Sequence, residues 1–193
     1  MNKMNKLTQI ALVGVALSQL HGCAALVVGG AATGAVAATD RRTAGVFVGD
    51  QEIELRAMSR LSEALPGKDT NIAVTSFNRQ VLLTGQVADE AARARAADAV
   101  KGVPDVRTVF NELSIGGATS LTSSANDTAI TANVKARLVR DERVPGTKIK
   151  LKTEAGVVYL MGLVTQAEAA VATGIARTSS GVTKVVTLFE IIN

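Results

Sequence analysis

The sequence contains an internal repeat: two stretches align without a gap when the chain is shifted by 77 residues. Ten of the 38 positions from 50 to 87 are identical to their counterparts from 127 to 164, far more than unrelated sequences share. The strongest match is Val81-Leu-Leu83-Thr-Gly85-Gln-Val87 against Val158-Tyr-Leu160-Met-Gly162-Leu-Val164. A duplication of this length limits the chain to two copies of one small module, each with its own core, rather than one medium-sized domain.

Each copy shows the same order of helix and strand patterns. Apolar residues at helical spacing predict a first helix, over 50–65 and 127–140, and Asp127 suits the N-cap of the second of these. Alternating patterns around short turns predict two hairpin strands, over 70–76 and 80–86 and again over 147–153 and 157–163. Alanine-rich helices follow over 88–101 and 165–178, and valine-rich strands close the copies over 106–115 and 183–192. The sequence therefore predicts an α+β fold of two αββαβ units, in each of which two helices cover a three-stranded mixed sheet.

Composition and charge limit what these units can do. Hydrophobic residues make up 47% of the chain but aromatic residues only 3%, so both cores must be aliphatic. Residues 50–116 carry 8 basic and 10 acidic side chains, whereas residues 124–193 carry 9 basic and 6 acidic ones. The second copy is therefore the one that an anionic surface attracts. Nucleic-acid binding is not expected, because no aromatic residues are interleaved with the basic ones.

The first 22 residues have the three parts of a secretory leader. Lys3 and Lys6 precede a short apolar run, and the tetrapeptide Leu20-His21-Gly22-Cys23 resembles the lipobox of bacterial lipoproteins. We therefore expect residues 1–22 to be a signal peptide, cut before Cys23, and Cys23 to be the site of lipid attachment. Acyl chains there would hold the protein on a membrane, and Ala24 at the next position makes the outer membrane the expected one. Residues 23–49 are predicted to be a lipidated flexible tether.

Catalytic groups are scarce in this chain. The only histidine, His21, lies in the predicted leader, and the only cysteine is Cys23. The processed chain would therefore lack an imidazole and a free thiol, the commonest general base, metal ligand and sulfur nucleophile. We predict no enzyme activity, no catalytic residues, no metal site and no cofactor.

The repeated motifs resemble those of BON domains, whose usual signature is Val-x-Leu-x-Gly-x-Val followed by Gly-Val-x-x-Val. The second part of that signature is Gly102-Val103-Pro-Asp-Val106 in the first copy and Gly181-Val182-Thr-Lys-Val185 in the second. The boundaries expected from this resemblance are a first BON domain over 50–116, a polar linker over 117–123 and a second BON domain over 124–193. Together with the lipobox and Met161-Gly162-Leu163-Val164-Thr165, the pattern is similar to the DolP/YraP group of dual-BON outer-membrane lipoproteins. For that group the resemblance implies binding of anionic phospholipid through the second domain and support of envelope integrity.

The helix predicted over 127–140 is the candidate lipid-binding element. One apolar stripe, with Ile130, Val134 and Leu138, should enter the core, and a second stripe of small residues lies on the other side, next to basic residues. The candidate phospholipid-binding residues are Asn126, Asp127, Ala129, Ala132, Lys135, Ala136, Val139 and Arg140. Two alternatives stay open: the alanines are helix formers only, or the stripe packs on the first BON domain.

Two functions are consistent with these patterns. The first is a non-enzymatic outer-membrane lipoprotein facing the periplasm, with a second BON domain that binds a phosphatidylglycerol-like lipid. The second is a periplasmic scaffold for protein partners, either outer-membrane assembly proteins or peptidoglycan-remodelling machinery. In both, the lipid on the N-terminus attaches the chain to the membrane.

Two smaller features also carry expectations. Gly85 and Gly162 are predicted to be required by the backbone at a strand end or bulge, rather than by a ligand. Lys148, Lys150 and Lys152 alternate along one strand and are predicted to form a solvated face.

Overall fold

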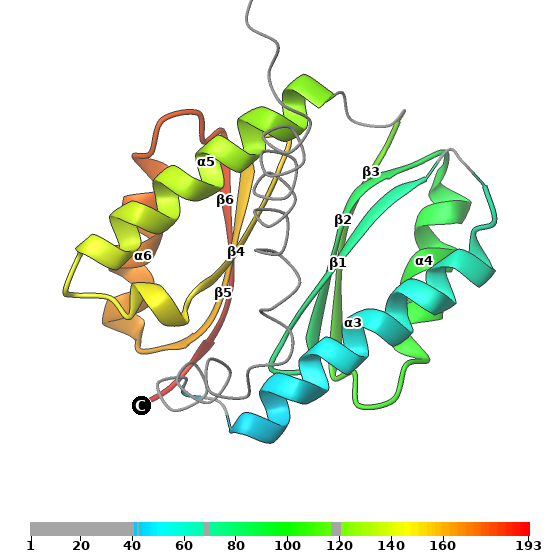
Figure 1. Ribbon diagram of the computed structural model, residues 1–193, viewed down its shortest axis with the longest axis horizontal. Coiled ribbons are helices and arrows are strands. Elements are labelled where there is room, and N and C mark those ends of the chain that lie inside the picture. Colours follow the sequence, from blue (N-terminus) through cyan, green and yellow to red (C-terminus); the bar gives the residue numbers. More distant parts are fainter. Residues whose placement is uncertain (1–40, 42, 68–69, 117–120) are drawn as a thin grey trace, which may run out of the picture. The chain divides into compact units, whose positions relative to one another are not determined.

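The computed structural model describes residues 41, 43–67, 70–116 and 121–193. The predicted leader, the lipidation site Cys23 and the greater part of the predicted tether lie outside these residues. The described residues belong to one compact unit, Thr39–Asn193, which contains both repeats. Figure 1 shows the order of the elements, which is αββαβ twice over, so the predicted α+β fold is confirmed.

The first repeat is a three-stranded mixed sheet with two helices. Its elements are α3 (Ala44–Ala64), β1 (Asn71–Phe77), β2 (Gln80–Val87), α4 (Glu90–Lys101) and β3 (Thr108–Ile115). Strand β2 lies in the middle, antiparallel to β1 and parallel to β3. The return from β2 to β3 passes through α4, as a parallel connection requires.

The second repeat has the same topology. Its elements are α5 (Leu121–Arg140), a short 3-10 helix (Gly146–Lys148), β4 (Lys150–Glu154), β5 (Val157–Val164), α6 (Gln166–Arg177) and β6 (Lys184–Ile191). Strand β5 is central, antiparallel to β4 and parallel to β6. Strand β4 is therefore an edge strand, and α5 packs beside it.

Alternation along the strands divides the buried side chains between two faces of each sheet. On the helix-covered face, Val81 and Leu83 join α3 and α4 in one core, and Val158 and Leu160 join α5 and α6 in another. The predicted core residues Ile130, Val134 and Leu138 are all buried. The opposite faces contribute to a third apolar cluster, which contains Phe77, Leu82, Tyr159, Met161 and Leu188.

Both first helices begin earlier than predicted. Helix α3 starts at Ala44 after the N-cap Thr43, so residues 44–49 of the predicted tether are helical. Helix α5 starts at Leu121, which places Asp127 in its second turn and makes the predicted N-cap wrong. The capping rule reads only local competition for backbone N–H groups, whereas the Asp127 carboxylate accepts hydrogen bonds from a distant turn.

Candidate functional site

A buried aspartate on the first helix holds the hairpin turn in both repeats. In the first, Asp50 accepts hydrogen bonds from the backbone N–H groups of Asn78 and Arg79 and from the Ser76 hydroxyl, each at 2.8 Å. In the second, Asp127 accepts from the N–H groups of Ala155 and Gly156, both at 2.8 Å. A turn whose two central residues have positive φ points these N–H groups away from the ladder, and the carboxylate satisfies them.

Asp127 is thus a buried structural residue in this fold, at 7% exposure. Its carboxylate fixes the β4–β5 hairpin against α5, so it positions the candidate lipid-binding helix rather than facing solvent. Its predecessor Asn126 is exposed. The repeat alignment of Asp50 with Asp127 was the sequence signal for this shared role.

The small-residue stripe of α5 faces solvent. Ala129, Ala132, Ala136 and Val139 are all exposed, and Val139 keeps 52% of its surface. Arg140, one position further along the helix, is exposed as well. The structure therefore offers a continuous, weakly apolar surface with a basic residue at its C-terminal end.

Lys135 has a different environment from the one its place in the sequence suggests. Its ammonium donates hydrogen bonds to the carbonyl oxygens of Gly146 at 2.8 Å, Thr147 at 3.4 Å and Ile149 at 2.7 Å. Burial lowers the pKa of Lys135 from its ordinary value. In this arrangement the side chain stabilises the segment that leads into β4, and Arg140 is the candidate residue whose charge is open to solvent.

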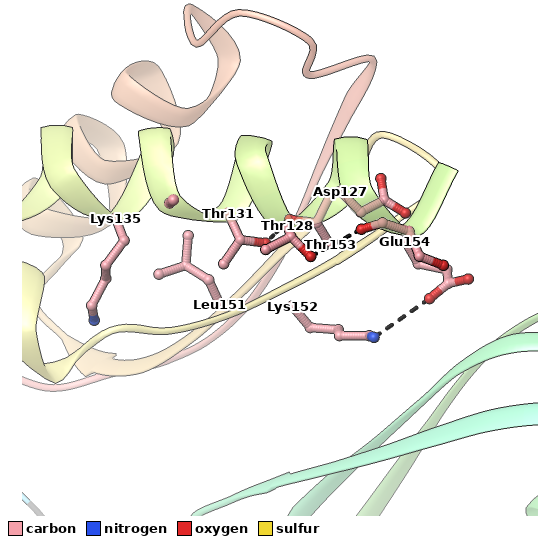
Figure 2. Close-up of a pocket in the computed structure, with 10 residues that line it drawn as sticks. Asp127, Thr128, Thr131, Lys135, Leu151, Lys152, Thr153 and Glu154 are labelled. Carbon is pink, nitrogen blue, oxygen red and sulfur yellow. Dashed lines mark hydrogen bonds and ion pairs between the residues drawn. The ribbon is translucent and has the colours of Figure 1, made fainter. Parts of the chain in front are cut away.

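A groove lies between α5 and the edge strand β4. Its volume is about 520 Å³, and Figure 2 shows Thr128, Thr131 and Lys135 projecting into it from α5, with Leu151 and Thr153 on the opposite side. The Thr131 and Thr153 hydroxyls are 2.7 Å apart and hydrogen-bonded across its floor. The sequence patterns did not predict this groove, because it depends on how closely the helix approaches the strand edge.

The predicted solvated row of lysines is wrong for Lys150. Its ammonium donates to Oε1 of Glu54 at 2.7 Å and to the carbonyl oxygen of Ser76 at 2.9 Å. Lys152 lies 3.5 Å from the Glu154 carboxylate. Lys148 lies in the 3-10 helix before β4 and not on the strand, so the predicted row does not extend to it. Sequence periodicity placed Lys150 and Lys152 on one face of the strand but could not show which acidic groups they meet there.

Arg41, the first described residue, forms a bidentate ion pair with α6. Its guanidinium donates to both carboxylate oxygens of Glu168 at 2.8 Å and to the carbonyl oxygen of Leu163 at 2.9 Å. Glu168 also accepts from the N–H of Thr165 in a capping box at the start of α6. The Arg41 hydrogen bonds, followed by those from Thr165, lower the pKa of Glu168 to about 2. Arg41 is thereby bound to the second repeat.

This ion pair predicts an acid-dependent loss of stability. Because the pKa of Glu168 is lowered in the fold, its contribution is complete above the ordinary value of 4.5 and is lost as the pH falls toward 2. Arg41→Gln should therefore lower the melting temperature at pH 7, and the difference from the parent chain should shrink between pH 4.5 and pH 2. Thermal unfolding across this range, with Arg177→Gln on the exposed end of α6 as the control, measures it. A difference that stays constant down to pH 2 would contradict the assignment.

Two further observations concern the chemistry of the described residues. No group of three His, Cys, Asp or Glu side chains among them is arranged to hold a metal ion. No helix within the described ranges is both long and apolar enough to cross a lipid bilayer.

Comparison with known proteins agrees with the repeat structure. The BON domain family model matches residues 49–117 and again residues 126–193. The outer membrane lipoprotein DolP of Haemophilus influenzae is 35% identical over 191 residues, covering 98% of this chain and 99% of the relative. The 21 kDa hemolysin of Actinobacillus pleuropneumoniae is 32% identical over 79% of each chain. The osmotically-inducible protein Y of Escherichia coli is 35% identical over 73% of this chain and 72% of its own length.

The names of these three relatives are those of a lipoprotein, a hemolysin and an osmotically inducible protein, and none is the name of an enzyme. The match to DolP extends over nearly the whole of both chains, including the N-terminal region that contains Cys23. Both the duplicated fold and this full-length similarity lead to the same assignment. The chain belongs to the BON-domain family and, within it, to the outer-membrane lipoproteins similar to DolP.

Proposed function

We propose that the second BON domain binds anionic phospholipid, of the phosphatidylglycerol type, through the solvent-facing side of α5. The observation that supports this most directly is the exposure of Ala129, Ala132, Ala136 and Val139 on one face of that helix. Small side chains let a helix approach lipid headgroups closely, and the excess of basic residues in the second repeat attracts an anionic surface.

The basic side chains close to this face differ in whether they are free to contact a lipid phosphate. Arg140 is exposed, whereas the Arg143 guanidinium is bound to Asp141 at 2.7 and 2.9 Å. Lys135 is held by three carbonyl groups of its own loop. We therefore propose that Arg140 contacts the lipid phosphate and that Val139 makes the apolar contact. Lys135 and Asp127 would stabilise the helix that carries these two residues. Asn126 completes the proposed surface at the N-terminal side.

In this proposal the membrane contact of α5 adds to the lipid at Cys23. A lipid anchor alone keeps the protein on its membrane, so the protein surface is free to recognise a particular headgroup. We propose that the protein faces the periplasm and supports the integrity of the outer membrane by binding anionic lipid there. The relative DolP is named for the same membrane.

Vesicle co-sedimentation tests the proposal. The probe is a set of vesicles with increasing phosphatidylglycerol in phosphatidylethanolamine, and the protein is residues 23–193 with Cys23→Ser, so that it carries no acyl chain. Arg140→Glu should weaken binding about tenfold or more, because one basic side chain near such a surface contributes about 1 kcal/mol and its reversal adds repulsion. Val139→Glu should weaken it similarly, since a carboxylate replaces the largest apolar group on the face.

Arg177→Glu is the matched control, because it makes the same charge change at an exposed position of α6. It should leave most of the binding intact, and salt should weaken the parent chain's binding. If Arg140→Glu and Arg177→Glu weakened vesicle binding equally, binding would depend on the net charge of the protein and not on the α5 surface. Absence of binding at every anionic fraction, with the fold intact, would refute the proposal.

One observation favours the alternative function as a protein-interaction scaffold. Helix α3 of the first repeat carries three exposed large apolar side chains: Val48 at 63%, Leu55 at 65% and Met58 at 48%. Their spacing of seven and three residues places them on one side of the helix, away from the core. Exposed large apolar side chains on one side of a helix are typical of a docking surface, and these would serve an outer-membrane assembly or peptidoglycan-remodelling partner.

A further inference from the structure

The two repeats differ in the residues that their first helix presents toward the edge strand. The groove of the second repeat is lined on α5 by Ser124, Thr131, Ala132 and Lys135. The residues 77 positions earlier, on α3, are Phe47, Glu54, Leu55 and Met58, of which the first three are larger than their counterparts. The first repeat thus has the carboxylate of Glu54 where the second has the short hydroxyl side chain of Thr131.

Strand β4 presents an open edge to this groove. The turn Ala155-Gly156 has two residues of positive φ, which makes Glu154 and Val157 a hydrogen-bonded pair. By alternation, Lys152 and Lys150 are also paired with β5, and the N–H and C=O groups of Leu151 and Thr153 point away from the sheet. The contact of Lys135 with the Ile149 carbonyl, two residues before Leu151, agrees with this direction.

The outward backbone groups of Leu151 and Thr153 have no partner among the described residues. The first repeat closes the same position. There Ser76, the counterpart of Thr153, donates its backbone N–H to Oε1 of Glu54 at 2.7 Å and accepts from Lys150 at 2.9 Å. Thr131, at the position of Glu54, is too short to do this and bonds the Thr153 hydroxyl instead.

We propose that the open edge of β4 binds an extended peptide segment, which adds to the sheet as a fourth strand in the groove beside α5. The added strand would exchange hydrogen bonds with the N–H and C=O groups of Leu151 and Thr153. The segment of β4 that can pair with an added strand is short. At one end the Ile149 carbonyl already accepts a hydrogen bond from Lys135, and at the other end the chain turns at Ala155 and Gly156. This site borders the lipid-facing side of α5 at Ala132, and the inference goes beyond the proposed function.

The chemistry of the groove specifies the peptide. Side chains of an added strand alternate between the two faces of the sheet. On one face they enter the groove, whose floor contains Ala132, Leu151 and the paired threonine hydroxyls, so small side chains fit. On the other face they lie beside Lys150, which is paired with Glu54, and Lys152, which is paired with Glu154. Lys148 of the preceding 3-10 helix adds a third positive charge against these two carboxylates, so acidic side chains are favoured over basic ones. The occupant is therefore a segment in which acidic and small residues alternate.

Amide hydrogen exchange measured by NMR tests this inference directly. The protein is the chain 23–193 with Cys23→Ser, and the probe is a blocked seven-residue peptide of alternating Ala and Asp. Saturating peptide should slow exchange at the Leu151 and Thr153 amides at least tenfold, with smaller changes elsewhere in β4. A peptide of alternating Ala and Lys, and an N-methylated form of the acidic peptide, should bind at least tenfold more weakly.

Thr131→Glu provides the decisive variant, since it places in the second repeat the residue that closes the edge in the first. It should reduce peptide affinity at least tenfold, whereas Asn133→Glu, the same new charge at an exposed position of α5 outside the groove, should not. Circular dichroism and thermal unfolding establish that both variants are folded. If Thr131→Glu fails to fold, Ala132→Leu, which fills the groove with the first repeat's residue, takes its place.

The outcomes separate this inference from the lipid proposal. Val139→Glu should weaken vesicle binding and leave peptide binding unchanged, and Thr131→Glu should do the reverse. Unchanged exchange at Leu151 and Thr153 under saturating peptide, or full affinity in the groove-filled variant, would overturn the inference. Protection of these two amides by phosphatidylglycerol vesicles and not by the peptide would also overturn it, by assigning the groove to lipid.

Discussion

Gly85→Ala is expected to destabilise the protein by about 3–5 kcal/mol, as backbone strain at positive φ and a clash in a packed core each cost about 1–3 kcal/mol. Gly85 has a φ of 112°, and a Cβ atom there would collide with the backbone carbonyl of Asn71 on the neighbouring strand. Backbone in a sheet cannot move aside without breaking the β1–β2 ladder. Chemical denaturation followed by circular dichroism measures the loss. The predicted backbone requirement is therefore confirmed at Gly85.

The equivalent glycine of the second repeat is the matched control, and there the sequence prediction is wrong. Gly162 is not in the left-handed region, and an added Cβ would meet its nearest neighbours, Ile149 and Val164, at an ordinary 3.5 Å. Gly162→Ala is expected to change the free energy of unfolding by less than about 1 kcal/mol. The shared Val-x-Leu-x-Gly-x-Val motif suggested one reason for both glycines, but the backbone adopts the strained conformation in only one copy. Equal losses from the two substitutions would contradict this account.

Asp50→Ala is expected to cost about 3–5 kcal/mol, because each buried donor left without a partner costs about 1–3 kcal/mol. The substitution removes the acceptor of three hydrogen bonds, from Ser76, Asn78 and Arg79. Asp50 is only 3% exposed, so water does not replace the carboxylate readily. Asp127→Ala removes two such bonds and should cost less.

The matched control at this position is Asp50→Asn, which keeps one oxygen acceptor and nearly the same volume. It should retain a part of the stability that the alanine variant loses. Denaturant unfolding of the three variants and the parent chain gives the comparison. A loss below about 1 kcal/mol in Asp50→Ala would show that the turn holds itself without the carboxylate.

Much of the fold could be predicted from the sequence, because the signals are local or repeated. Apolar spacing located the helices that bury Ile130, Val134 and Leu138, and strand alternation located Val158 and Leu160. The duplicated glycine and valine motifs were sufficient to indicate the BON family, which the family match confirms. Helix starts were less predictable, since Ala44 and Leu121 continue helices upstream of the strongest apolar pattern.

The candidate site was only partly predictable. The exposed stripe through Ala129 and Val139 follows from helical geometry, and the structure agrees with that placement. The partners of Lys135 and Asp127 do not follow from it, because they lie in a loop and a turn more than ten residues away. The same local sequence allows a charged residue on a helix either to face solvent or to form hydrogen bonds with nearby backbone carbonyl groups.

The sequence by itself determined that this protein is one small aliphatic α/β module built twice, since periodicity, duplication and composition are properties of the chain alone. Only the tertiary structure showed which pairs of equivalent residues make the same hydrogen bonds in both repeats. Asp50 and Asp127 both clamp a turn, whereas Glu54 closes a strand edge that Thr131 leaves open. The physical reason is that a hydrogen bond is specified within a few tenths of an ångström, and only the folded chain brings distant donors and acceptors to that distance.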